Sequence, residues 1–432
     1  MRPRLVACWA VLAAATFTMS WLHGQDGPPS AEKSPGPSGT PPATPAPLVL
    51  GVENTSRDSG TLAPSRDLSR LNKIQQQHLL TAQRGADWLY RMNGVKGRFL
   101  PGYLPALKQP MESDNYFHQV SAAAALARAA RFTGEERFAV RATQALLALL
   151  EDTVLDASDS LSRHTIMPPA AVNRIASASL LVLAIHELPS PQKDLLDRAE
   201  ELLRYVARQP AADGKTRLVE TVDRGLSQEY SGMALSALAV SNRRRPAAWK
   251  MDLVRRALPG HRTAWEQSRS MDTTVWLTVA FAEAFLQTKE KEFADLVLTM
   301  NDWLCTLQYT QIDPRRMYWY GGFMTLVDGR SVESEPVIQS GHYACSLIEA
   351  GRVARERGDI ERHQRFQEGV ERCLQFLGTL QYTEAGTQHF SSWYRPQLVG
   401  AFHLSRTDGN IRLDYTQHAV CALFGYLEQL TP

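Results

Sequence analysis

Apolar residues recur along the chain at intervals of three and four residues, and no run alternates with the period of two that a half-buried strand would show. This pattern predicts an almost entirely helical protein. The predicted helices cover residues 70–93, 116–133, 135–151, 172–187, 191–208, 228–241, 247–257, 272–288, 290–307, 339–357, 360–381 and 413–430.

The predicted helices alternate between two kinds. One set is rich in Ala, Ser and Leu and has few charges, whereas the partner of each carries many charges. The first set begins near residues 116, 172, 228, 272, 339 and 413. A helix that is apolar on nearly all sides is buried, and a helix with a charged face lies outside. The alternation therefore predicts an all-α fold, an (α/α)6 toroid of six helical hairpins in which the last, inner helix closes on the first, outer one.

A second repeat supports this arrangement. The segments WLCTLQYT (303–310) and FLGTLQYT (376–383) each end an outer helix, and a glycine-aromatic element follows each of them, GGF at 321–323 and GAF at 400–402. The segment WLYRMNGVKGRF, near Trp88, is a weaker copy. Glycines at these points would allow the backbone to approach the helix ends closely.

With these repeats, residues 70–432 resemble two groups of helical toroids. One group contains six-hairpin glycosidases, sugar epimerases and polysaccharide lyases, and the other contains terpenoid cyclases and prenyltransferases. Gln308 and Gln381 match the glutamine of the glutamine-glycine-phenylalanine repeat in the cyclase group. The chain has neither the DxDD motif nor the aspartate-rich metal motif of that group, so the resemblance favours carbohydrate chemistry over cyclisation.

Polar residues gather where the inner helices begin, and in a toroid these helix starts meet at one mouth. His118, His342 and His418 occupy one repeat position, and Asp114 and Asp414 precede the first and the last of them by four residues. Residues four apart share a helix face, so we expect the three histidines to form one patch. An imidazole beside a carboxylate can act as a general acid/base pair.

Further candidates lie at the same helix starts and in the neighbouring loops. The predicted catalytic set also includes Glu229 and Asp272, and the predicted substrate-binding set is Arg174, Arg412, Tyr116, Tyr230, Tyr343, Tyr415, Gln417, Trp319 and Trp393. Aromatic rings and arginines suit stacking on sugars and pairing with uronate carboxylates. The alternatives are that the acids cap helices, that the histidines are satisfied core residues and that the aromatic rings fasten loops.

The cysteines beyond the N-terminal region are Cys305, Cys345, Cys373 and Cys421, too few and too widely spaced for a disulfide scaffold. Each lies in a helical apolar pattern, which favours buried thiols. His342 with Cys345 and His418 with Cys421 would allow zinc binding, but no CxxC or HExxH motif supports it. No cofactor is expected.

The N-terminal region differs in composition from the rest. Arg2 and Arg4 precede an apolar run at residues 5–22, so residues 1–24 are predicted to be an export signal or a membrane anchor. Residues 25–66 are rich in Pro, Ser and Gly and predict a disordered tether, which leaves residues 67–432 for the toroid. The expected location is periplasmic, extracellular, or membrane-anchored and facing outward.

Overall composition narrows the partners. Of 432 residues 44% are hydrophobic and 21% charged, and the net charge of +2 gives no electrostatic footprint for nucleic acid. The preferred hypothesis is an exported protein that acts on or binds an oligosaccharide or a uronate-containing polysaccharide, as a hydrolase, lyase or epimerase. The alternatives are a terpenoid-cyclase-like or prenyltransferase-like toroid, and a non-catalytic toroid that binds a glycan or a protein. Any membrane contact would be made by the N-terminal segment alone.

Overall fold

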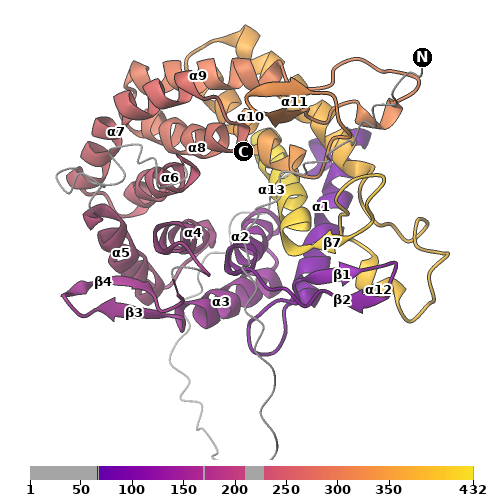
Figure 1. Cartoon of the computed structure of the whole chain (residues 1–432), viewed down its shortest axis with the longest axis horizontal. Coiled ribbons are helices and arrows are strands. Elements are labelled where there is room, and N and C mark those ends of the chain that lie inside the picture. The colour runs from indigo at the N-terminus through magenta and orange to yellow at the C-terminus, as the bar shows by residue number, and fades with distance from the viewer. Residues whose placement is uncertain (1–65, 67, 169–170, 210–227, 432) are drawn as a thin grey trace, which may run out of the picture. The chain divides into compact units, whose positions relative to one another are not determined.

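The structure is a computed structural model that describes residues 66, 68–168, 171–209 and 228–431. These belong to one compact unit, Ser59–Pro432. Its long helices form two concentric layers (Figure 1). The inner layer contains α2 (Tyr116–Thr133), α4 (Arg174–Glu187), α6 (Gln228–Arg244), α8 (Met271–Thr288), α10 (Ser340–Glu356) and α13 (Leu413–Leu430). The outer layer contains α1 (Lys73–Met92), α3 (Glu136–Leu150), α5 (Lys193–Arg208), α7 (Ala248–Gln267), α9 (Lys291–Cys305) and α11 (Ile360–Gly378).

The inner helices form a closed ring. Each packs against the next in the order α2, α4, α6, α8, α10 and α13, and α13 returns to pack against α2. Helix α1 packs against α13, so the first and the last helix of the unit form the sixth hairpin. The predicted toroid is therefore confirmed: a ring of apolar helices is enclosed by a ring of helices with charged faces.

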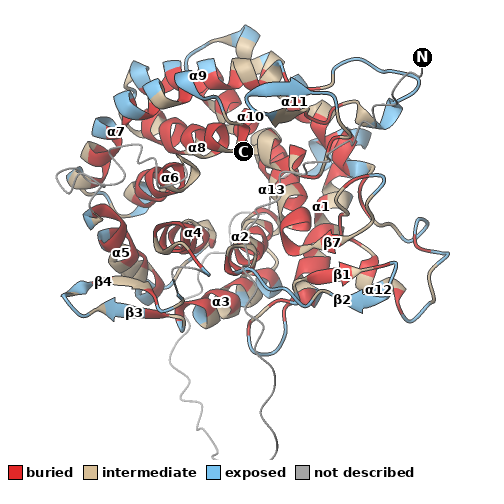
Figure 2. Ribbon diagram, viewed as in Figure 1, coloured by how far each residue is buried: buried red, intermediate tan, exposed pale blue. Residues whose placement is uncertain are grey.

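The two layers follow from composition. Helix α4 buries residues on all sides, including the run from Ile175 to Val182, whereas α5 buries one stripe, Leu195, Ala199, Leu202 and Val206. Figure 2 shows the same division, with buried residues through the inner layer and exposed residues on the outward faces of the outer helices. The predicted segment 1–24, and the predicted tether 25–66 except for its last residue, lie outside the described residues. Within the described part, no helix is long and apolar enough to cross a membrane.

The glutamine-glycine-aromatic repeat has a structural basis. The Gln308 side-chain amide donates to the carbonyl oxygens of Gly321 at 2.9 Å and Gly369 at 2.8 Å. The Gln381 amide donates in the same way to Gly400 at 3.1 Å and to Thr81 at 2.9 Å. Each glutamine thus ties the end of one outer helix to the next outer helix around the ring.

The glycines of this repeat are required by the backbone. Gly321 has φ of 88° and Gly400 has φ of 95°, which L-residues rarely adopt. A Cβ at Gly321 would lie 2.0 Å from the Arg372 carbonyl oxygen, and one at Gly400 would lie 2.3 Å from that of Arg84. The repeat therefore fixes how closely neighbouring outer helices approach.

The sequence did not predict the short strands, which all lie in connections from an outer to an inner helix. They are β1 (Gly102–Leu104), β2 (Gln109–Pro110), β3 (Thr153–Asp156), β4 (Asp159–Thr165), β5 (Thr325–Val327), β6 (Arg330–Val332) and β7 (Ile411–Arg412). The sheet β2-β1-β7 joins the loop before α2 to the loop before α13. Three further short pieces are 3-10 turns η1 (Leu68–Arg70) and η2 (Met317–Trp319) and helix α12 (Arg395–Leu398).

One predicted helix was too short. The expected segment 247–257 stops before Pro259, but α7 continues through this proline to Gln267. Proline removes one backbone donor and normally ends or bends a helix. Here the apolar stripe continues past it to His261 and Trp265, both buried, and this packing keeps the last turns helical.

Candidate active site at the mouth of the inner ring

Three inner helices, α2, α4 and α8, are capped by residues other than the predicted acids. Asn115 caps α2, Asn173 caps α4 and Ser270 caps α8, each through a side-chain oxygen. Asp114 instead accepts bonds from the Asn115 backbone N–H and the Gln119 amide, both at 2.8 Å, and is exposed. Asp114 is therefore not a helix cap, and Asp272 does not cap α8.

The first cluster of the mouth joins α13 to α2. The Arg412 guanidinium donates two bonds to the Asp414 carboxylate, at 2.9 and 2.6 Å, and lies 4.5 Å from the centre of the Tyr415 ring. Nδ1 of His118 lies 3.7 Å from Oδ1 of Asp414. Burial alone would raise the pKa of Asp414, but the bond from Arg412 and the nearby His118 lower it, so this carboxylate stays charged.

The second cluster joins α13 to α10. The rings of His342 and His418 lie 5.1 Å apart, and the Trp276 ring from α8 lies 5.5 Å from that of His342. Burial lowers the pKa of His342, and burial together with the neighbouring His342 lowers the pKa of His418 to about 3. Both imidazoles are therefore neutral near pH 7. Nδ1 of His418 is buried and has no hydrogen-bond partner among the residues that the structure describes.

The two α10 and α13 backbones come close beside this pair. A Cβ on Gly341 would lie 2.9 Å from the His418 carbonyl oxygen. Glycine at this position lets the helix carrying His342 approach the helix carrying His418. The contact between the two histidines thus depends on a small residue next to one of them.

The third cluster joins α6 to α8 and α10. Burial, and then the charge of Asp272, raises the pKa of Glu229 to about 7. Burial and a hydrogen bond with Asp272 raise the pKa of Tyr343. The Tyr230 ring lies 6.4 Å from that of Phe117 on α2, so it faces across the mouth from α6. Glu229 therefore keeps its proton for about half of the time at pH 7, next to a second carboxyl group.

The clusters form a single arc around the mouth. Asp414 and His118 both influence the pKa of His418, and the charge of Asp272 partly offsets the lowering of the pKa of His342 by burial. Each cluster is therefore electrostatically linked to the next. The structure places together the predicted residues His118, His342, His418, Asp272, Asp414, Glu229, Arg412, Tyr230, Tyr343 and Tyr415.

Several predicted residues lie apart from this arc. The Tyr116 hydroxyl donates to the Leu149 carbonyl oxygen of α3 at 2.9 Å, so this ring points to the outer layer. Arg174 interacts with Tyr205 of outer helix α5 and lies near Asp156 of the β3-β4 hairpin. Gln417 donates to the Cys421 sulfur at 3.4 Å, one turn further along α13. Tyr116 and Arg174 stand at the first residue of their helices, where a side chain can point either way, and both point to the outer layer. Gln417 instead points along α13 towards Cys421.

The two predicted loop tryptophans also lie apart. Trp319 packs 5.3 Å from the Tyr309 ring and 4.7 Å from the Arg316 guanidinium, as a ring that fastens its own loop would do. Trp393 is 66% exposed and packs beside Tyr394. No contact joins either tryptophan to the histidines in the described residues. Sequence reasoning did not place Trp276 in the site, although its position four residues after Asp272 puts it on the same helix face.

The arrangement offers acid/base chemistry from protein groups. It combines a carboxyl group that is half protonated near neutral pH, a second carboxyl group beside it, two neutral imidazoles and a charged Arg412–Asp414 pair. In the described residues, no three His, Cys, Asp or Glu side chains are grouped so that they could hold a metal ion.

Comparison with known proteins finds the fold and no family. No family model matches the sequence, and no curated protein matches it. Among solved structures, the cellobiose 2-epimerase from Bacillus thermoamylovorans has a TM-score of 0.61 at 10% identity and covers 83% of this chain and 100% of its own. The GH76A α-1,6-mannanase from Salegentibacter has a TM-score of 0.56 at 11% identity, with 82% and 99% covered.

A third similar structure is the unsaturated glucuronyl hydrolase of a Bacillus species, with a TM-score of 0.56 at 14% identity and coverage of 97% of its length. At these identities the likeness concerns the fold. The chain therefore shares the (α/α)6 toroid fold of these structures, as its sequence predicted.

Proposed function

We propose that this protein is an exported carbohydrate-active enzyme that cleaves glycosidic bonds at the mouth of the inner ring. The observation that carries the proposal is the pair of carboxyl groups on α6 and α8. Glu229 has its pKa raised to about 7 by burial and by the charge of Asp272. Two neighbouring carboxyl groups, one of which keeps its proton near neutral pH, are the arrangement that glycoside hydrolysis uses.

The roles follow from these states. Glu229 donates its proton to the glycosidic oxygen as the bond to the sugar carbon breaks, and the departing sugar leaves with a new hydroxyl group. The Asp272 carboxylate stabilises the positive charge that develops on the sugar ring. A water molecule then adds its hydroxyl group to the sugar carbon and gives its other proton to Glu229, which restores the acid. Trp276, Tyr230 and Phe117 offer aromatic faces to the sugar.

The proposal favours a neutral saccharide over a uronate. Arg412, the arginine of the arc, is held by both oxygens of Asp414, and Arg174 points towards Tyr205. The described residues of the arc thus include two carboxylates, Asp272 and Asp414, and one guanidinium, which is already paired with Asp414. A uronate carboxylate would meet repulsion there. Glycan chemistry also suits this polar lining better than a hydrocarbon substrate of the cyclase type.

The test is a screen of the purified full chain against neutral and uronate-containing oligosaccharides, with detection of new reducing ends. We expect release from a neutral substrate that Glu229→Gln abolishes, while Val140→Phe on the outer surface leaves it unchanged. Release from uronate substrates alone would contradict the preference for neutral sugars. No release from any substrate would contradict the hydrolase.

A second candidate reaction is epimerisation, and a separate observation favours it. His342 and His418 are both neutral and face each other at 5.1 Å, so one could remove a proton from a sugar carbon and the other could return one. Incubation in D2O separates the two reactions. Epimerisation would introduce carbon-bound deuterium into the sugar, whereas hydrolysis would release reducing ends without it.

A further inference from the structure

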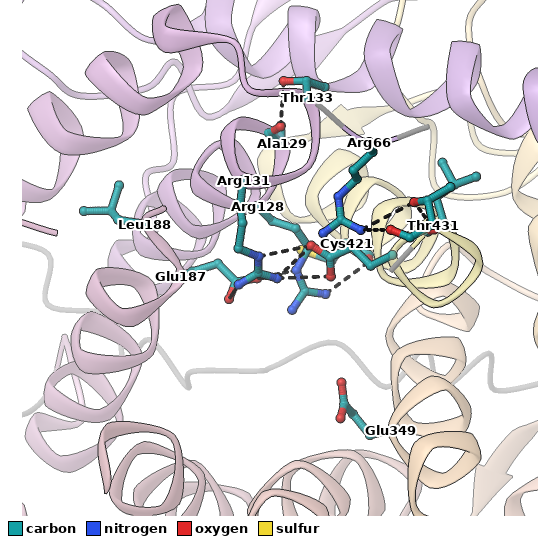
Figure 3. Close-up of polar contacts among 12 residues, drawn as sticks. Arg66, Arg128, Ala129, Arg131, Thr133, Glu187, Leu188, Glu349, Cys421 and Thr431 are labelled. Atoms are coloured by element: carbon teal, nitrogen blue, oxygen red, sulfur yellow. Dashed lines mark hydrogen bonds and ion pairs between the residues drawn. The ribbon is translucent and has the colours of Figure 1, made fainter. Parts of the chain in front are cut away.

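The inner ring carries a second polar cluster at the opposite end of its helices (Figure 3). Arg131 of α2 binds Glu187 of α4 at 2.8 Å and Glu428 of α13 at 3.0 Å. Arg128 pairs with the same Glu187 and donates to the Cys421 carbonyl oxygen at 3.2 Å. These contacts link three of the inner helices at their C-terminal ends.

The same cluster continues around the ring. Arg243 of α6 lies 3.6 Å from Glu283 of α8, and Arg352 of α10 lies 2.6 Å from Glu349. We name this set the floor cluster: Arg128, Arg131, Arg243, Arg352, Glu187, Glu283, Glu349 and Glu428. Four arginines and four glutamates balance in charge, so the floor cluster suits an uncharged ligand with many hydroxyl groups better than an ion.

A partly exposed stripe connects the mouth to the floor cluster. On α2, His118, Ser121, Ala124 and Arg128 are all half-buried while the residues between them are mostly buried. Their spacing of three and four residues places them on one face of the helix. His118 contacts α13, and Arg128 contacts both α4 and α13, so this face points to the axis of the ring.

Helix α10 has a matching stripe. His342, Cys345, Glu349 and Arg352 are half-buried at the same spacing. Solvent therefore reaches the axial face of both helices between the histidines and the floor cluster. The residues between are small, Ser121, Ala124, Cys345 and, on α13, Cys421. We call this space the lumen; ten residues of α2 separate its ends, which corresponds to about 15 Å of helix.

Charged groups at the bottom of the lumen face each other. Figure 3 places Glu349 across the opening from Arg128. Arg352 binds one oxygen of Glu349, and Arg128 uses Nε and Nη1 in its contacts with Glu187 and Cys421. A carboxylate and a guanidinium with remaining hydrogen-bonding capacity are suited to the hydroxyl groups of a sugar.

We propose that the lumen extends the binding site, so that a neutral oligosaccharide enters at the mouth and its far end contacts Arg128 and Glu349. This inference rests on the proposed function, because it assumes that the mouth binds a saccharide. It adds a substrate class, oligosaccharides long enough to span the lumen. Such chains should bind more tightly than short ones.

Calorimetric titration with oligosaccharides of two and four units, α-1,6-linked mannose and β-1,4-linked glucose, tests the inference. For the series that binds, we expect the tetrasaccharide to bind at least tenfold more tightly than the disaccharide. Ala124→Phe should fill the lumen and remove this difference, with the affinity for the disaccharide unchanged within twofold. The matched control, Val140→Phe on the exposed face of α3, should behave as the wild type.

Glu349→Ala provides a second variant that opens the lumen instead of filling it, and it should weaken tetrasaccharide binding alone. Equal affinity for both lengths in the wild type would overturn the lumen proposal and leave the proposed function intact. A length difference that persists in both variants would overturn it too. Binding of neither series would contradict the lumen proposal and the saccharide function together, whereas a failure confined to the tetrasaccharide concerns the lumen alone.

Discussion

The two ends of the inner ring differ in how their polar groups are satisfied. At the floor cluster, opposite charges are paired, and although burial alone would raise the pKa of Glu187, Arg128 and Arg131 lower it to about 2. At the mouth, burial raises the pKa of Glu229 to about 7 and lowers that of His418 to about 3. In the described part of the chain, Nδ1 of His418 has no hydrogen-bond partner. The floor cluster holds paired charges, whereas the mouth holds, beside its Arg412–Asp414 pair, groups that are neutral or partly protonated near pH 7.

This difference separates stability from reactivity. Interhelical ion pairs with several bonds per charge hold neighbouring helices in register. Buried titratable groups with shifted pKa values do not stabilise the fold and are suited to exchanging protons with a substrate. We therefore expect substitutions at the mouth to affect activity and substitutions in the floor cluster to affect ring closure, so that the two ends respond in different measurements.

The largest expected effect is on catalysis. Glu229→Gln keeps the shape of the side chain but cannot donate a proton, so kcat should fall about 10²- to 10⁴-fold, the usual contribution of a general acid. The free energy of unfolding should stay the same or rise, because a buried acid next to Asp272 becomes an amide. Steady-state kinetics and urea denaturation measure both. A kcat within threefold of the wild type would remove Glu229 from its proposed role.

The second effect is on stability. Arg131→Ala leaves Glu187 and Glu428 without one of their partners, and breaking a largely buried pair costs roughly 3 kcal/mol. Urea denaturation should show this loss, while kcat for a disaccharide, per folded molecule, stays unchanged.

Arg137→Ala is the matched comparison, because its ion pair with Asp87 is about half-exposed and should cost less than about 1 kcal/mol. Equal losses in the two variants would mean that the floor cluster does not hold the ring closed. A loss of kcat in Arg131→Ala would mean that the two ends are not separable.

Much of this comparison could be predicted from the sequence. Helical periodicity and the alternation of apolar and charged helices fixed the toroid and its closure, and the repeat position of His342 and His418 indicated their contact. The floor cluster was missed because each inner helix carries only one or two of its charges. Its partners, such as Arg131 and Glu428, are 297 residues apart and meet only when the ring closes.

Side-chain direction could not be predicted. Tyr116 and Arg174 stand at the first residue of their helices, where the backbone has not yet determined an inner or an outer face. Strands of two to seven residues, such as β7 and β4, are too short for an alternating pattern to stand out. The raised pKa of Glu229 depends on burial and on Asp272 of another helix, which no local pattern records.

The third prediction concerns pH: activity at the mouth should be lost at high pH, and the stability that the floor cluster provides should be lost at low pH. Activity requires protonated Glu229, so kcat/KM should fall as the pH rises through about 7. Glu187 has a folded pKa of about 2 against an ordinary value of 4.5. Its contribution to stability is therefore present above pH 4.5 and is lost as the pH falls towards 2.

A pH series of activity and of urea denaturation would measure both limits. Glu187→Gln should remove part of the acid-dependent loss of stability and leave the alkaline limit of activity in place. If the alkaline limit moved in this variant, or were absent from the wild type, the assignment of that limit to Glu229 would be wrong.

The smallest expected effect on stability comes from His418, and it tests the comparison most finely. The imidazole is neutral in the folded protein because burial and His342 lower its pKa to about 3, whereas in the unfolded chain it titrates near 6.5. Stability should thus decline as the pH falls from 6.5 towards 3, since only the unfolded chain takes up the proton in that range. His418→Ala should flatten this decline, change the free energy of unfolding at pH 7 by about 1 kcal/mol or less, and still abolish activity or glycan binding. A structural histidine would give the reverse, with a clear loss of stability at pH 7 and function reduced only in proportion to the unfolded fraction. That result would mean that the His342–His418 contact only packs α10 against α13, and that Glu229 and Asp272 alone carry the proposed chemistry of the mouth.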